Sequence, residues 1–178
     1  MKNVFARNAL LGIMLACTAL AAGSDKETVV GISVQQIHAD QSQLQDGQHI
    51  SSGQPTSETL ALFASAGYVA VVDMRTADED RGFDEENEVV DLGMTYVSIP
   101  VGGKYDISFA KAAELDRVLA ELDGPVLLHC ASGNRVGALL ALRAKQNGAS
   151  SEDALDIGRQ AGLTRLAPIV EERLAEHE

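Results

Sequence analysis

The segment HCASGNRVG, residues 129–137, places a cysteine, a glycine and an arginine close together. Cys130 ends the apolar stretch PVLLHC, which is typical of a buried strand, and Val136 begins an apolar stretch typical of a helix. The six residues CASGNR therefore form a strand-to-helix loop, and Gly133 gives the backbone freedom to turn tightly. Such a loop could hold an anion, carry a reactive sulfur atom or only connect two elements.

The chemistry available to this loop follows from its position before a helix. A tight turn there points successive backbone N–H groups into one hollow at the positive end of the helix dipole. An anion in the hollow would be bound by these donors, and the guanidinium of Arg135 could add two charge-assisted hydrogen bonds. The same field favours a thiolate over a thiol, which would make Cys130 a nucleophile at neutral pH.

The N-terminal segment suggests export. Lys2 and Arg7 precede an apolar run over residues 9–22. That run is shorter than the roughly 20 apolar residues of a membrane span, and the small residues that close it resemble a cleavage site. We therefore predict a signal peptide at residues 1–22 and a periplasmic or secreted protein. A lipid anchor at Cys17 is the second possibility.

Cleavage would leave Cys130 as the only cysteine and would change the net charge from −12 to about −14. A lone cysteine in an exported protein is either buried or used in chemistry. So acidic a chain repels nucleic acid and anionic lipid, so neither is expected as a partner. The four histidines are scattered and no Cys-x-x-Cys pair exists, so no metal or other cofactor is predicted.

Residues 23–45 are polar and glutamine-rich, and we interpret them as a leader with room for one short element. Residues 46–178 are predicted to form a single domain in which strands and helices alternate. Strands are predicted in HISSGQP, YVAVVDMR, TYVSIPV and PVLLHC; helices are predicted in TSETLALFASAG, in the end of the acidic stretch before Gly93, in SFAKAAELDRVLAELDG, in VGALLALRAKQNG and in two C-terminal segments.

This alternation predicts a three-layer α/β fold with a mostly parallel central sheet of four to five strands flanked by helices. Ligands of such folds bind beyond the carboxyl ends of the strands. Three predicted strand ends carry candidate residues to that edge: Asp73 with Arg75, residues 100–106, and His129 with Cys130.

The chain resembles the cysteine-based tyrosine and dual-specificity phosphatases. The pattern SGQP, VVDMR, YVSIPV and VLLHCASGNR, over about residues 48–145, is similar to the bacterial branch named after the phosphatase-like domain of beta-lactamase hydrolase-like proteins. The resemblance implies a phosphatase-like fold. It further implies that Cys130 attacks phosphorus to form a phosphocysteine, that His129 supports the loop from beneath, and that no metal is needed. The implied substrate-binding groups are Arg135 and the N–H groups of Ala131, Ser132, Gly133, Asn134 and Arg135.

The chain departs from the family pattern at three places. Four residues, not five, separate Cys130 from Arg135, which gives a six-residue ring like that of the rhodanese sulfurtransferases. Val136 stands where a serine or threonine usually helps to break down the phosphoenzyme. The aspartate general acid expected after the IPV-type strand is absent at the usual place, and the first carboxylate is Asp106, which could serve as the acid or only mark a helix start.

Two interpretations of Arg75 stay open: it could bind an anionic substrate, or it could pair with the acidic residues 78–88. The function also has alternatives. We predict a phosphatase that acts on a small phosphorylated substrate or a phosphoprotein. A sulfurtransferase with a persulfide on Cys130 is the second hypothesis, and a phosphate- or sulfate-binding module without turnover is the third.

Overall fold

The computed structural model describes residues 29–39 and 49–176. The predicted signal peptide, residues 1–22, and the candidate lipidation site Cys17 lie outside the described residues, as do parts of the predicted leader. Within the described ranges, no helix combines the length and the apolar character needed to cross a bilayer.

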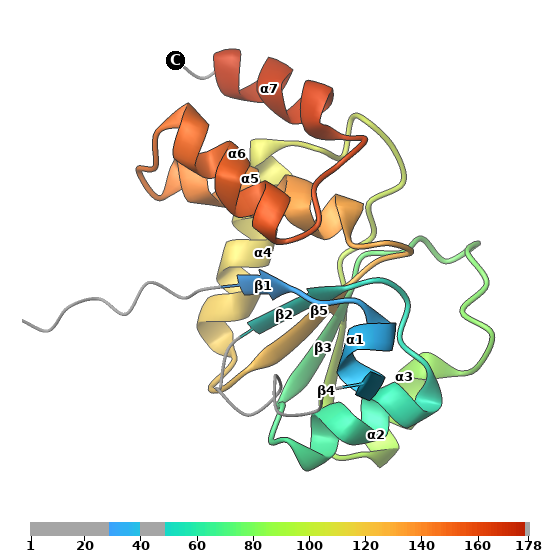
Figure 1. Cartoon of the computed structure of the whole chain (residues 1–178). Helices are drawn as coiled ribbons and strands as arrows, with labels where there is room; N and C mark the ends of the chain where they lie inside the picture. The colour runs from blue at the N-terminus through green and yellow to red at the C-terminus, as the bar shows by residue number, and fades with distance from the viewer. Residues whose placement is uncertain (1–28, 40–48, 177–178) are drawn as a thin grey trace, which may run out of the picture.

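Five parallel strands form one sheet with the order β1-β2-β5-β3-β4 (Figure 1). The strands are β1 (Val29–Gly31), β2 (His49–Ser52), β3 (Ala70–Asp73), β4 (Thr95–Ser98) and β5 (Val126–His129). Every residue of β2, β3 and β5 is buried, as expected for strands covered on both faces. The predicted α/β fold with a parallel sheet is confirmed.

Helices cover both faces of the sheet (Figure 1). Val71 and Leu127 face one apolar core, with side chains of α2 and α3; Val72 and Leu128 face a second core, with side chains of α4 to α7. The helices are α1 (Val34–Ala39), α2 (Ser57–Ser65), α3 (Glu85–Asp91), α4 (Phe109–Glu121), α5 (Asn134–Gln146), α6 (Ser151–Gln160) and α7 (Ala167–Ala175).

The side-chain caps explain where two of these helices begin. The Thr56 hydroxyl accepts a hydrogen bond from the Thr59 N–H, and the Ser108 hydroxyl accepts one from the Lys111 N–H. Gly67, which follows α2, has a φ of +86°, a conformation that glycine adopts without strain. The predicted start and end of this helix are therefore confirmed.

The fold extends further toward the N-terminus than the sequence predicted. Strand β1 lies within the segment that we interpreted as a leader, and it pairs with β2 in the register Val29↔His49. A Cβ atom on Gly31 would lie 2.5 Å from the Gln160 carbonyl oxygen, so α6 ends directly against this edge strand. With only two valines in a polar context, the three-residue strand lacks the periodicity that identified the others.

Candidate active site

Cys130 follows the last residue of β5, the central strand of the sheet, and its side chain is fully buried as a free thiol. The Cys130 N–H donates to the Ser52 carbonyl oxygen at 3.4 Å, and Ser132 forms an isolated β-bridge with Gly53. The end of β2 thus fixes the first half of the loop, and the cysteine lies at its base.

The second half of the loop leads directly into α5. Gly133 has a φ of +78°, and the first intrahelical bond runs from the Gly137 N–H to the Gly133 carbonyl oxygen at 2.9 Å. The N–H groups of Asn134, Arg135 and Val136 therefore have no intrahelical acceptor. They belong to the positive end of a 13-residue helix, which is where oxyanions bind in proteins.

The back of the loop is held by the segment after α6. The side-chain oxygen of Asn134 accepts hydrogen bonds from the N–H groups of Thr164 at 2.8 Å and Leu166 at 3.4 Å. A Cβ atom on Gly162 would lie 3.2 Å from the Gly133 carbonyl oxygen. Asn134, predicted to contribute its N–H group, therefore also anchors the loop through its side chain.

Arg135 lies in the first turn of α5 and is held by the segments that follow β3 and β4. Its Nη1 donates to the carbonyl oxygens of Val101 at 2.9 Å and Met74 at 3.3 Å. The hydrogen bond to the Glu79 carboxylate raises the pKa of Arg135 against the opposing effect of burial, and the nearby Cys130 side chain acts in the same direction as Glu79. The two residues predicted to attack and to bind phosphate are thus carried on the same short loop, which leads into α5.

Glu79 is a residue of the candidate site that the sequence analysis missed. Its two carboxylate oxygens accept from Arg135 Nη1 at 2.6 Å and Nη2 at 2.7 Å. This hydrogen bond holds the pKa of Glu79 far below its usual range, against the opposing effect of burial. Glu79 lies in an acidic stretch whose composition is typical of solvated surface. The only signal in the sequence is its position four residues after Arg75, a spacing at which opposite charges often pair.

Arg75 pairs with the acidic stretch, as one of its two interpretations expected. Its Nε donates to Glu79 at 3.1 Å, Nη2 donates to the Asp80 carbonyl oxygen at 2.9 Å, and Nη1 donates to the side-chain oxygen of Gln54. All three guanidinium nitrogens are therefore engaged. Its role as a direct substrate ligand stays a prediction, and its described contacts are those of a residue that helps to hold Glu79.

Asp106 lies in the loop that joins β4 to α4. Its carboxylate accepts a hydrogen bond from the Gly102 N–H at 2.7 Å, which closes the turn over residues 102–106. Ser108, not Asp106, caps α4, so the helix-start interpretation does not account for the aspartate. The same loop begins at Val101, whose carbonyl oxygen binds Arg135, so Asp106 is carried on a segment that contacts the site.

A buried ionic cluster lies beneath the cysteine loop. His129 is fully buried, and its Nε2 lies 2.9 Å from Glu85 Oε1 and 3.5 Å from Asp73 Oδ1. The other oxygen of Asp73 accepts from Arg81 Nε at 2.6 Å and from the Tyr96 hydroxyl at 2.8 Å. Burial, followed by this hydrogen bond to Asp73, raises the pKa of Tyr96 above its usual value.

The same three residues have the spacing of a metal site, since ligand atoms of Asp73, Glu85 and His129 lie within 4.8 Å of one another. Arg81, however, already neutralises Asp73, and a bound cation would lie beside its guanidinium. The donor set therefore fits a structural cluster of buried polar groups better than a metal centre. His129 lies in this cluster and directly precedes Cys130 in the chain, and its predicted support of the loop stays a prediction.

Comparisons with known proteins agree with this geometry. A family described as "DSP-PTPase phosphatase fused to NAD+ Kinase" matches residues 26–167. The chain is 32% identical over 109 residues to a beta-lactamase hydrolase-like protein of Xylella fastidiosa, covering 59% of this chain and 25% of that protein. A homologue in Agrobacterium fabrum is 28% identical over 121 residues, with 65% and 28% covered. The chain thus spans about a quarter of these relatives.

Solved structures share the fold. A candidate phosphatase of Neisseria meningitidis superposes with a TM-score of 0.58 at 18% identity, covering 68% of this chain and 89% of that one. The active form of Tk-PTP superposes with a TM-score of 0.55 at 22% identity, covering 71% and 90%. Given the match over most of its length, the chain belongs to the phosphatase family of the dual-specificity and tyrosine phosphatase type that is described as fused to NAD+ kinase.

Proposed function

We propose that the protein hydrolyses phosphomonoesters through a phosphocysteine formed on Cys130. The observation that carries this proposal is the position of Cys130 at the base of a loop that leads into the N-terminus of α5, where Arg135 and three N–H groups without an intrahelical acceptor lie. A thiolate, a guanidinium and free helix N–H groups at one point are what an in-line attack on phosphorus needs, because catalysis of this reaction consists largely of positioning and charge stabilisation.

The two chemical steps assign a role to each group. In the first step a bond forms between Cys130 Sγ and phosphorus, the bond from phosphorus to the alcohol oxygen breaks, and a proton is delivered to that oxygen. In the second step water attacks the phosphorus of the phosphocysteine and gives a proton back to the group that acted as the acid, the bond between sulfur and phosphorus breaks, and inorganic phosphate and the thiolate are released. Arg135 and the loop N–H groups stabilise the equatorial oxygens in both steps.

We propose Asp106 as the donor of the proton. The adjacent Gly102 and Gly103 allow the loop to move, and Asp106 would reach the site by exchanging its bond with the Gly102 N–H for one with the leaving oxygen.

We also propose a substrate range of the dual-specificity type, because the groups described so far would bind only the phosphate and not the rest of the substrate. Export to the periplasm remains a proposal that rests on residues 1–22 alone.

The experiment that tests the proposal compares the wild type with Cys130→Ser. The purified protein receives p-nitrophenyl phosphate in one assay and thiosulfate with cyanide in another. We expect phosphate release by the wild type and a loss of at least about a thousandfold in Cys130→Ser, since serine is a far weaker nucleophile at neutral pH.

The second assay tests the sulfurtransferase alternative, which the six-residue ring and Val136 favour. Thiocyanate formation that depends on Cys130, without phosphate release, would replace the phosphatase proposal. Binding of inorganic phosphate with neither product would leave only a binding module.

A further inference from the structure

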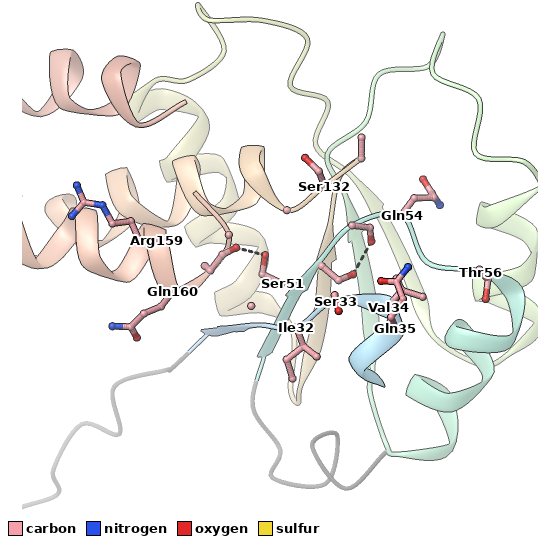
Figure 2. Close-up of a pocket in the computed structure, with 17 residues that line it drawn as sticks. Ile32, Ser33, Val34, Gln35, Ser51, Gln54, Thr56, Ser132, Arg159 and Gln160 are labelled. Atoms are coloured by element: carbon pink, nitrogen blue, oxygen red, sulfur yellow. Dashed lines mark hydrogen bonds between the residues drawn. The ribbon is translucent and has the colours of Figure 1, made fainter. Parts of the chain in front are cut away.

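A cavity of about 590 Å³ opens beside the cysteine loop, on the side of β2 and β1 (Figure 2). We propose that this cavity binds the alcohol part of the substrate and that this part is non-aromatic and rich in hydroxyl groups, such as a sugar or a polyol. The inference rests on the proposed phosphatase function and specifies its substrate class. The volume lies within the range of small-molecule sites.

The cavity shares a wall with the candidate active site. Ala131, Ser132 and Gly133 line it, and Ser132 is bridged to Gly53 at the end of β2. The remaining walls come from the start of α1 and the end of α6. A phosphate bound at the loop can therefore extend its alcohol part into the cavity, whose lining does not include Arg135 or Glu79.

Most of the side chains that line the cavity are neutral and polar. Although the chain carries 26 acidic residues, no carboxylate and no aromatic ring belongs to the described residues of the lining. The one charged side chain, Arg159, is half exposed and pairs with Asp156 at 3.0 Å and Glu171 at 3.8 Å. The polar lining side chains are those of Ser33, Gln35, Ser51, Ser52, Gln54, Thr56, Ser132 and Gln160.

Some of these groups are already satisfied and others are available. Within the described part of the chain, Ser51 donates to the Ala161 carbonyl oxygen, and Gln54 binds Arg75 and Glu85. The side chains of Gln35 and Gln160 are exposed on opposite sides of the cavity (Figure 2), and neither makes a hydrogen bond to another described residue. A carboxamide both donates and accepts, which matches a hydroxyl group.

The described lining residues include no aromatic side chain that could stack on a phosphotyrosine ring. An aromatic ring gains its binding energy from apolar contact and stacking. The apolar side chains in the lining besides Ala131 and Ala161 are Ile32, which is buried, and Val34. A polyol would instead exchange its hydrogen bonds with water for bonds with Gln35, Gln160 and the Ser132 hydroxyl.

The test measures kcat/KM for glucose 6-phosphate, glycerol 3-phosphate, phosphotyrosine and p-nitrophenyl phosphate. The variants are Gln35→Ala and Gln160→Ala, and Gln146→Ala is the matched control because Gln146 lies outside the cavity lining. We expect the wild type to prefer glucose 6-phosphate or glycerol 3-phosphate to phosphotyrosine. The ratio of kcat/KM for the preferred polyol phosphate to that for p-nitrophenyl phosphate should fall about three- to tenfold in each cavity variant.

The control should keep the wild-type ratio. A preference for phosphotyrosine, or a ratio unchanged in both cavity variants while hydrolysis still depends on Cys130, would overturn the assignment of the cavity and leave the phosphatase function standing. If no phosphate ester is hydrolysed in a Cys130-dependent way, the proposed function itself fails and the inference fails with it.

Discussion

The guanidinium of Arg135 is held in place by several hydrogen bonds. Nη1 is bonded to the carbonyl oxygens of Met74 and Val101 and to Glu79, and Nη2 is bonded to Glu79. Its position is therefore determined by groups from the loops after β3 and β4, and Glu79 contributes the only charged partner among them. This makes Glu79 a positioning residue that acts through Arg135.

Replacing Glu79 with glutamine should lower kcat/KM for p-nitrophenyl phosphate by about ten- to a hundredfold. The carboxylate that fixes two guanidinium nitrogens is lost, and small displacements of a binding group are costly in catalysis. Steady-state kinetics checks this, with Glu86→Gln as the control, since Glu86 is exposed and lies outside the site. Equal kcat/KM values for Glu79→Gln and the wild type would show that Arg135 needs no such partner.

The lowered pKa of Glu79 also predicts how stability depends on pH. Because its folded value is depressed, the ion pair contributes its full stability above the ordinary glutamate value near 4.3. That contribution is lost as the pH falls from there toward the folded value. The difference in free energy of unfolding between the wild type and Glu79→Gln should be constant between about pH 5 and 7 and shrink below about pH 4. Urea unfolding measures it, and a difference that stays constant to about pH 3 contradicts the assignment.

Asp106→Asn tests the source of the proton. If Asp106 is the general acid, the variant should lose the basic limb of the pH profile of kcat/KM, and hydrolysis of an alkyl phosphate should fall about a hundredfold. The loss should be smaller for p-nitrophenyl phosphate, whose leaving group needs little protonation. An unchanged pH profile would remove Asp106 from the mechanism.

At the scale of single residues, sequence reasoning found the groups that carry a motif and missed those that support them. Cys130 and Arg135 are recognisable because they frame a strand-to-helix loop. Glu79 and Glu85 lie in an acidic stretch whose composition is typical of solvated surface, yet one binds Arg135 and the other lies against His129. Such pairings depend on how loops fold back over the sheet, which no local pattern encodes.

The secondary-structure elements hold the cysteine loop through close packing of α5 on α6. A Cβ atom on Gly137 would lie 2.6 Å from the Gly158 carbonyl oxygen and would also overlap the Leu163 N–H. This close approach brings the segment after α6 against Gly133 and lets Asn134 bind Thr164. The helix pair thus determines where the loop backbone lies.

Gly137→Ala should therefore destabilise the protein by about 1–3 kcal/mol, because the added methyl group forces the two helices apart. Urea unfolding measures the change in the free energy of unfolding. Gly103→Ala is the matched control, since nothing lies within 4 Å of its Cβ position and its φ is not positive. A Gly137→Ala variant as stable as that control would show that the contact is easily relieved.

The elements themselves were largely predictable. Buried strands such as β3 and β5 are continuous apolar runs, and α2 and α4 carry their capping residues in the sequence. Strand β1 was not predictable, because three residues at a sheet edge carry little hydrophobic signal and its pairing with β2 depends on tertiary contact.

In the whole molecule, the strand order explains why the site forms where it does. β5 lies at the centre of the sheet, so that β3 and β4 bring Glu79 and the Asp106 loop to one side of Cys130, and β2 and β1 bring the cavity to the other. The predicted convergence of strand ends places Val101 and Met74 against Arg135. The chain has a net charge of −12, but the N-terminus of α5 and Arg135 contribute positive charge at the site, which favours the binding of an anionic substrate.

The central claim is that the Cys130 sulfur becomes bonded to phosphorus during turnover. Mixing the protein with p-nitrophenyl phosphate, quenching in acid within one turnover and mapping the peptides by mass spectrometry tests it directly. We predict a phosphoryl group on the peptide that contains Cys130, and none on that peptide in Cys130→Ser. Rapid phosphate release with an unmodified Cys130 peptide at every quench time would contradict the account.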